Sequence, residues 1–243
     1  MPNPCGAGCR PCDNWRAVSN PPLLRLLESS PWVAALTPEL RARVESETLV
    51  KRVPANGYVC RKGEAVDYWI GVIDGLVKMA NVSADGKPTS FTGLPAGGWF
   101  GEGSVLKDEP RRYDVVALRD STIAYVPRAT FMALLDSSVA FNRFLLLQLN
   151  ERLGQFIAMV EHDRLLGPDA RLARGLAGLF NPILYPGLGR SLPLSQEEMG
   201  QLVGLSRQRV NQALQKLEAA GLLRIDYGGV TIDDLEGLRR FEG

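Results

Sequence analysis

Residues 194–223, LSQEEMGQLVGLSRQRVNQALQKLEAAGLL, constrain the fold of this chain more than any other stretch. Ser195 followed by Glu198 has the spacing of a capping box, in which the hydroxyl accepts from a first-turn N–H group and the carboxylate reaches back. The pattern predicts a short helix that starts at Ser195, and Gly204 predicts its end because glycine tolerates a positive φ. Ser206 is expected to cap a second helix directly after this turn.

The second helix has one apolar face and one polar face suited to reading DNA. Its polar positions carry arginine, glutamine and asparagine, which pair with the edges of guanine and adenine in the major groove. The expected inward residues are Val210, Ala213, Leu214 and Leu217. The candidate DNA-binding residues are Ser206, Arg207, Gln208, Asn211 and Gln212, with Ser206 on the DNA backbone.

A hairpin is expected after the two helices. A strand over 222–227, the dipeptide Gly228-Gly229 and a strand over 230–232 have the pattern of two strands joined by a two-residue turn. Two helices followed by a hairpin make a winged helix-turn-helix. Without the hairpin, a solvated helix pair inside an all-α core would explain the two helices equally well.

Residues 48–126 change to short β-strands separated by turns. Asp74-Gly75 and Asp85-Gly86 have the composition of two-residue hairpin turns. Strands are expected at residues 68–73, 76–79, 91–94, 115–118 and 122–126. These strands predict a small antiparallel barrel or roll of about eighty residues, with room for a ligand inside.

Residues 131–164 predict one long helix, which Gly167-Pro168 ends. Its apolar residues recur at alternating spacings of three and four, which is the heptad seam of a coiled coil. A seam on one chain needs a partner chain to cover it, so we expect a dimer helix; a core helix packed on the β-domain is the alternative. The seam residues are Leu146, Leu149, Leu153, Phe156 and Val160.

These segments together resemble the Crp/Fnr superfamily of bacterial transcription regulators. The Ser206-Arg207 start of the second helix, the wing and the sequence LEAAGLL are similar to the superfamily's C-terminal domain. The implied fold class is α+β, with an N-terminal antiparallel β-roll like that of cyclic-nucleotide-binding domains, a long dimerisation helix and a C-terminal winged helix-turn-helix. The expected boundaries are 1–22 for a Cys/Pro-rich arm, 23–130 for the β-roll domain, 131–166 for the dimerisation helix and 167–243 for the DNA-binding domain.

The resemblance implies a homodimeric, sequence-specific transcription regulator rather than an enzyme. Each recognition helix would enter the major groove of a palindromic operator, RNA polymerase would be a protein partner, and a signal in the β-roll or the arm would rotate the DNA domains. Gln208 stands where better-known relatives carry Glu, so we expect an altered half-site. The alternatives are a cyclic-nucleotide-sensing module that acts on a protein partner, and a phosphate-ester enzyme, against which the missing metal ligands and general bases argue.

The glycine-rich segment 95–115 resembles the phosphate-binding cassette of cyclic-nucleotide-binding domains. The resemblance implies a ribose contact at the Gly-Glu-Gly run and a phosphate contact at the first arginine. The candidate effector-binding residues are Gly101, Glu102, Gly103, Arg111 and Arg112. The sequence departs from the family pattern in having Arg112, where cAMP-binding members carry a small hydroxyl residue, followed by Tyr113 and Asp114. An acid beside a phosphate is unfavourable, and a tyrosine fills space. A turn in which Arg111 holds a local carboxylate is therefore favoured over a cyclic-nucleotide site.

Four cysteines are candidates for a metal site: Cys5, Cys9, Cys12 and Cys60. Four thiolates bind an iron–sulfur cluster or a zinc ion. Oxygen-sensing members of the superfamily hold a cluster with three N-terminal cysteines and one from the β-roll, although the spacing here differs. We favour reduced thiols and no cofactor, with a cyclic nucleotide and an iron–sulfur cluster as the open alternatives.

Net charge and composition limit how this protein can bind DNA, where it is expected to be located and whether it is expected to be an enzyme. The formal net charge is +1, so DNA affinity must come from a local basic face rather than from a global field. The sequence has no apolar stretch of membrane-spanning length and no apolar secretory signal, so we expect a cytoplasmic protein without a membrane partner. His162 is the only histidine, and it leaves no Ser/His/Asp or Cys/His set for catalysis.

Overall fold

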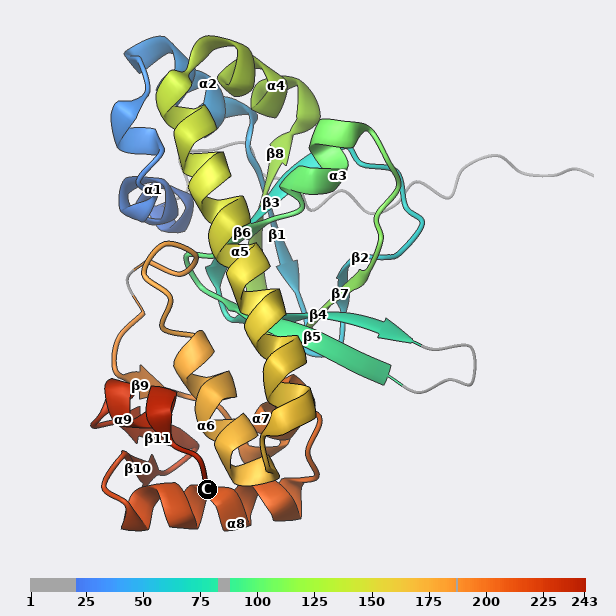
Figure 1. The fold of residues 1–243 in the computed structure, drawn as a ribbon. Helices are drawn as coiled ribbons and strands as arrows, with labels where there is room; N and C mark the ends of the chain where they lie inside the picture. The colour runs from blue at the N-terminus through green and yellow to red at the C-terminus, as the bar shows by residue number, and fades with distance from the viewer. Residues whose placement is uncertain (1–20, 83–87, 187) are drawn as a thin grey trace, which may run out of the picture.

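The computed structural model describes residues 21–82, 88–186 and 188–243. A β-roll domain lies at one end, a long helix runs down its side, and a compact C-terminal domain lies at the far end of that helix (Figure 1). The expected α+β class is confirmed, with antiparallel sheets, a long helix and a C-terminal helix-turn-helix. The expected domain boundaries stay predictions.

Short helices form the start of the described chain. They are α1 (Pro21–Ser29), a 3-10 turn (Val33–Ala35) and α2 (Pro38–Glu47). The Thr37 hydroxyl caps α2 by accepting from the Leu40 N–H group at 3.4 Å, and Pro38 occupies the first turn, where its missing N–H group costs nothing. Trp32 packs edge-on against Trp99 with ring centroids 5.3 Å apart, so these helices close one end of the β-roll.

Two four-stranded antiparallel sheets make the roll. One sheet has the order β1 (Leu49–Val53), β8 (Ser121–Pro127), β3 (Tyr68–Asp74) and β6 (Trp99–Phe100). The other has the order β2 (Tyr58–Cys60), β7 (Asp114–Ala117), β4 (Leu76–Val82) and β5 (Pro88–Pro95). Their inner faces meet in a core of branched and aromatic side chains, including Ile70, Val77 and Phe100, as two packed sheets require.

The hairpin expected at Asp74-Gly75 is wrong. β3 pairs with β8 and β6, whereas β4 pairs with β5 and β7 in the other sheet. Only Gly75 separates the two strands, and a one-residue link is too short for the two-residue turn of a hairpin. Gly75 has a φ of 99° and lies against Ser121, so it turns the chain from one sheet to the other. The turn expected at Asp85-Gly86 lies outside the described residues.

The single long helix expected over 131–164 is also wrong. The chain forms α4 (Arg128–Ser137) and α5 (Val139–Leu165), bent by 110°. Ser138 lies at the break and caps α5, since its hydroxyl accepts from the Phe141 N–H group at 3.2 Å. The bend lets Phe131 of α4 and Phe141 of α5 enter one core, which a straight helix would prevent. Among the described residues, no single helix is long and apolar enough to cross a membrane; only α4 and α5 counted together meet that length and composition.

The C-terminal domain surrounds its own apolar core. Its elements are α6 (Pro168–Gly178), β9 (Ser191–Leu192), α7 (Gln196–Val203), α8 (Arg207–Ala219), β10 (Leu223–Asp226), β11 (Gly229–Ile232) and α9 (Leu235–Arg240). The wing forms as expected, but Asp226 pairs with Gly229, so its turn is Tyr227-Gly228, one residue earlier than predicted. β9 adds a third strand, which the Pro- and Gly-rich loop around it did not indicate.

Candidate functional site

Local signals in the sequence build the helix-turn-helix. Both halves of the expected capping box form: the Ser195 hydroxyl accepts from the Glu198 N–H group at 3.2 Å, and the Glu198 carboxylate accepts from the Ser195 N–H group at 2.7 Å. Gly204 ends α7 with a φ of 68°. The Ser206 hydroxyl then caps α8 by accepting from the Arg209 N–H group at 3.3 Å. The two helices and the turn between them are therefore confirmed.

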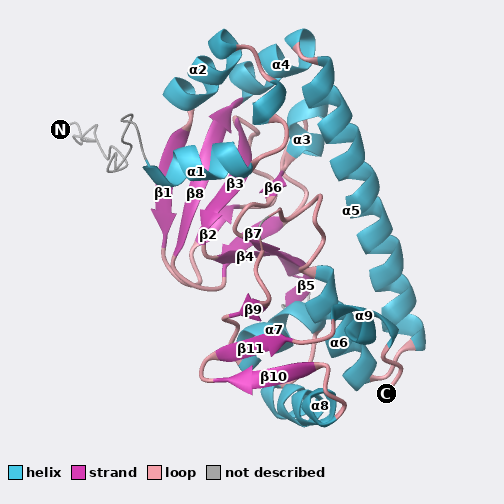
Figure 2. Ribbon diagram, turned by 90° about the vertical axis from the view of Figure 1, so that its left-hand side faces the viewer, coloured by secondary structure: helices cyan, strands magenta, loops and turns pink. Residues whose placement is uncertain are grey.

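α8 separates its two faces as the pattern predicts. Its four expected inward residues are all buried, in one core with Leu172 and Leu176 of α6. Four of the five candidate DNA-binding residues are exposed: Ser206, Arg207, Gln208 and Gln212. Asn211 is half-buried, and its side-chain oxygen accepts from the Gln196 amide at 3.0 Å. α8 lies at the end of the molecule furthest from α4, where a DNA duplex can approach it (Figure 2).

Asp169, in the first turn of α6, holds two basic side chains of α8. Its carboxylate lies 2.5 Å from the Lys216 ammonium and 2.9 Å from a guanidinium nitrogen of Arg209. Arg209 in turn donates to the side-chain oxygen of Gln212 at 2.9 Å. Asp169 was not predicted from the sequence, because an acid after Gly167-Pro168 indicates only a favourable charge in the first turn of a helix.

The cassette builds a tight turn around Arg111. Gly101 has a φ of 88° and precedes α3 (Glu102–Lys107), and a side chain at Gly101 would collide with the Arg111 guanidinium. That guanidinium is buried and donates to the carbonyl oxygens of Gly101, at 3.3 Å, and of Tyr68. The expectation that Arg111 holds a local carboxylate is therefore wrong. Glu102 faces α5 instead.

Glu102 meets a polar cluster that comes from α5. The Arg152 guanidinium lies 3.6 Å from the Glu102 carboxylate, and Arg152 and Gln148 both donate to the Trp99 carbonyl, at 2.8 and 2.6 Å. All three polar side chains are buried, and each keeps at least one polar atom without a hydrogen-bond partner. Burial, the largest single effect, lowers the pKa of Arg152, but the Glu102 carboxylate together with Tyr185 and Tyr113 outweighs burial, so its pKa is raised overall. Gln148 and Arg152 were not predicted from the sequence, because the heptad pattern of this helix points only to its apolar seam.

The other cassette residues separate. Arg112 is exposed and pairs with Glu109 at 2.6 Å, so the structure does not bring it to Glu102. Gly103 lies in the first turn of α3 with open space beside it. Tyr113 is half-buried, and burial together with the Glu102 charge raises its pKa to about 12. Tyr113 therefore stays a neutral phenol that can both donate and accept.

The cysteine site is only partly described. Cys60 is buried in β2, and burial raises the pKa of its thiol to about 11. Cys5, Cys9 and Cys12 lie outside the described residues. The residues that the structure does describe include no group of three or more potential metal ligands. The four-cysteine metal site stays a prediction.

The seam of α5 is exposed in the single chain. Leu146 keeps 67% of its surface exposed, Leu153 59% and Val160 46%, and Leu149 is also exposed. Phe156 is half-buried. Water-exposed leucines in a continuous row are unusual for a monomer, so this face is suited to a second apolar surface.

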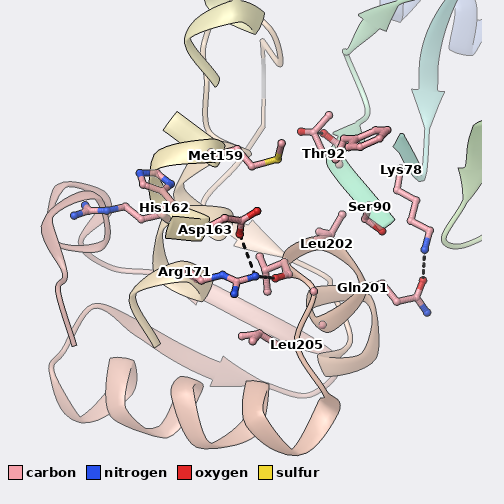
Figure 3. A pocket seen from close by; sticks show the side chains of 18 of the residues that line it. Lys78, Ser90, Thr92, Met159, His162, Asp163, Arg171, Gln201, Leu202 and Leu205 are labelled. Carbon is pink, nitrogen blue, oxygen red and sulfur yellow. Dashed lines mark hydrogen bonds and ion pairs between the residues drawn. The ribbon is translucent and has the colours of Figure 1, made fainter. Parts of the chain in front are cut away.

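The C-terminal domain also contacts the β-roll. Arg119, beside β8, pairs with the capping-box Glu198 at 2.7 Å, and Lys78 of β4 donates to Gln201 of α7 at 3.0 Å. A cavity of about 600 Å³ lies between β5, α5, α6 and α7 (Figure 3). Arg171 borders it, pairs with Asp163 at 3.1 Å and donates to the Val203 carbonyl. The helix-turn-helix is thus held against the part of the chain that carries the cassette.

His162 lines the same cavity. It is half-buried near the end of α5, and burial, aided by the Arg174 charge, lowers its pKa. The imidazole is therefore neutral over a wider pH range than usual.

Two family models match this chain: the cyclic nucleotide-binding domain over residues 50–138 and the Crp-like helix-turn-helix domain over residues 170–241. The cAMP-activated global transcriptional regulator CRP of Haemophilus influenzae is 27% identical over 176 residues, which cover 71% of this chain and 78% of the relative. The CRP-like cAMP-activated global transcriptional regulator of Mycobacterium tuberculosis is 28% identical over 190 residues, which cover 77% and 85%. The structure of FixK2 from Bradyrhizobium japonicum has a similar fold, with a TM-score of 0.64 and 20% identity, covering 81% of this chain and 98% of that chain.

Proposed function

This chain belongs to the Crp/Fnr family of DNA-binding transcription regulators, and on that premise we propose that it acts as a homodimer on a palindromic operator. The recognition helix α8 would enter the major groove, with Arg207, Gln208, Asn211 and Gln212 at base edges and Ser206 at the backbone. RNA polymerase is the protein partner that we expect, and the cytoplasm is the location. The observation that carries the proposal is the polar row that α8 exposes while its other face is buried.

The dimer rests on α5. A palindromic operator needs two recognition helices related by a two-fold axis, and an isologous interface along one helix supplies that axis. The exposed row at Leu146, Leu149, Leu153 and Val160 has the spacing of such an interface. Covering it with the same row of a second chain removes these leucines from water.

We propose that the β-roll is the sensor and that its signal reaches α5 through Glu102 and Arg152. Both relatives named above carry "cAMP-activated" in their names, so a nucleotide is the first class of effector to try. In this chain the two buried side chains and Gln148 keep polar atoms unpaired, which an effector's hydroxyl or anionic group would satisfy. An effector there would change the contacts of the helix that carries the dimer seam.

Selection of duplexes from a random pool, followed by a salt titration, tests the DNA-binding proposal. We expect one sequence with two-fold symmetry, bound at least about 10³-fold more tightly than random duplex, with affinity that falls steeply as salt rises. Arg207→Ala should weaken binding, whereas Glu236→Gln, which removes an exposed ion pair on α9, should not. Equal affinity for all duplexes would contradict the proposal and favour a sensing module that acts on a protein partner.

Coupling between the β-roll and DNA binding can be tested without knowing the effector. Arg152→Met removes the buried link to Glu102 and should change the affinity for the selected operator several-fold, about 1 kcal/mol or more. Arg112→Met is the matched control, because Arg112 is exposed and its ion pair among the described residues is with Glu109. Equal operator affinity of the two variants and the unchanged chain would show that the cassette is not coupled to DNA binding.

A further inference from the structure

Two exposed glutamines on α8 differ in how their side-chain amides are hydrogen-bonded. Gln208 and Gln212 are one helical turn apart, both exposed. The Gln212 side-chain oxygen accepts from Arg209 at 2.9 Å. The hydrogen bonds of the described residues include none to the Gln208 side chain, so its amide is free to turn. The same residue type is thus fixed at one position and free at the other.

The chemistry of arginine settles which end of the Gln212 amide points where. A guanidinium carries donors only, so it contacts the amide oxygen and never the amide nitrogen. The oxygen of Gln212 therefore faces Arg209, which takes one of its two lone pairs, and its NH2 group points away from Arg209 toward a ligand. This orientation does not depend on assigning oxygen and nitrogen from their positions, which is otherwise the weakness of amide side chains.

Asp169 fixes Arg209 in turn. Its side chain is only 8% exposed, and its carboxylate makes an ion pair with Arg209 at 2.9 Å and a hydrogen bond with Lys216 at 2.5 Å. The Arg209 contact is close but poorly aligned for a hydrogen bond, so it acts mainly through charge. Because α6 and α8 share one apolar core, the carboxylate holds a fixed place relative to the recognition helix.

We propose that Asp169 and Arg209 are positioning residues that make Gln212 a donor-only reader of DNA. Recognition of adenine by glutamine needs the amide oxygen to accept from the 6-amino group while the nitrogen donates to N7. With its oxygen turned toward Arg209, Gln212 favours guanine, whose N7 and O6 are both acceptors. Gln208, which is free to turn, keeps the adenine preference. The inference rests on the proposed placement of α8 in the major groove.

Base selection with matched variants tests this assignment. The position read by Gln212 is identified as the one whose preference is lost in Gln212→Ala. We expect guanine there for the unchanged chain, and we expect Arg209→Met to shift that position toward adenine by about tenfold, which is the effect of one base contact. The position read by Gln208 should not change. Asp169→Asn should shift this position toward adenine by less than Arg209→Met does. Asp169→Glu, which keeps the carboxylate, should keep the preference for guanine.

A purely structural role would give a different result. If Arg209 only stabilises the domain or contacts a phosphate, Arg209→Met lowers affinity equally for all sequences and leaves the base preference unchanged, which overturns the inference. Thermal unfolding of each variant shows whether it is folded, and Glu236→Gln serves as the control for loss of an ion pair in this domain. Adenine at the Gln212 position of the unchanged chain would also overturn this inference, but it would leave the proposed function standing. The absence of any selected sequence overturns the proposed function instead.

Discussion

α5 packs on the β-roll through apolar side chains near its start, but its middle turns have two faces that differ from those of an ordinary surface helix. The face toward the β-roll carries Gln148 and Arg152, which are buried, while the face toward solvent carries Leu146 and Leu153, which are exposed. A surface helix of a monomer buries its apolar side chains and exposes its polar ones. This arrangement fits a helix that contacts the cassette on one side and, as proposed above, a second chain on the other.

The apolar outer face and the polar inner face of α5 are suited to different roles. An apolar row favours association with another apolar surface. The hydrophobic effect is non-directional and scales with the apolar area removed from water, so it does not respond to a single polar group. Buried polar groups respond strongly to a change of partner, because an unpaired charge in a low dielectric is costly. The outer face is therefore suited to holding the dimer and the inner face to sensing. Substitutions on each face test this division, and a third near the end of α5 tests its titrating histidine.

Breaking the outer face should abolish the dimer. Leu153→Glu places a carboxylate in the proposed seam, where two copies of the charge would meet near the two-fold axis. We expect sedimentation of a monomer and a loss of operator affinity of about 10³-fold or more, since each half-site alone supplies only part of the contacts. Asn150→Glu adds the same carboxylate at an exposed polar position of the same helix and should remain dimeric. Dimeric Leu153→Glu with unchanged DNA affinity would contradict the assignment of the seam.

Breaking the inner face should cost stability but leave the dimer intact. Arg152→Met removes the cation beside Glu102 and leaves a buried carboxylate uncompensated, so we expect a loss of about 3 kcal/mol in the free energy of unfolding. Urea denaturation measures this loss. The double variant Glu102→Gln with Arg152→Met should regain part of it because no buried charge is left. Equal stability of the single and double variants would show that the two side chains do not interact.

The smallest effect concerns His162, near the end of α5. Its pKa is lowered in the folded chain, so the unfolded chain binds the proton more tightly. Its contribution to stability is fully present above the unfolded pKa near 6.5 and is lost as pH falls toward the lowered folded pKa. Replacing it in His162→Gln should flatten the pH dependence of stability between about pH 7 and 5 by less than about 1 kcal/mol, because the ring is partly exposed. Urea denaturation at the two pH values measures it, and an unchanged slope would exclude His162 as the titrating group.

Features that depend on neighbouring residues could be predicted from the sequence, whereas features that depend on residues far apart in the chain could not. The helix-turn-helix was predictable almost residue by residue, because Ser195, Glu198, Gly204 and Ser206 act on their own first or last turns. The strands were predictable from composition, but their pairing was not. Asp74-Gly75 has the composition of a hairpin turn, and only the packing of two sheets shows that the chain changes sheet there.

The contacts that connect the parts were not predictable from the sequence. The break at Ser138 depends on Phe131 and Phe141 sharing one core, which no local pattern reveals. Arg152 and Asp169 make their contacts 50 and 40 or more residues away, with Glu102 and with the recognition helix. A single sequence carries no local signal for such pairs, although the buried inner row of α5 could have been sought as the face opposite the seam.

The number of chains bound to one DNA duplex tests whether this protein is a dimeric regulator. Sedimentation of the full chain with a fluorescent duplex that carries the selected palindrome, and with one that carries a single half-site, counts the chains bound to each. We predict two chains on the palindrome, bound at least about 100-fold more tightly than to the half-site, because both recognition helices engage only when both half-sites are present. One chain per duplex, or equal affinity for the two duplexes, would contradict a dimeric regulator that reads a two-fold symmetric operator.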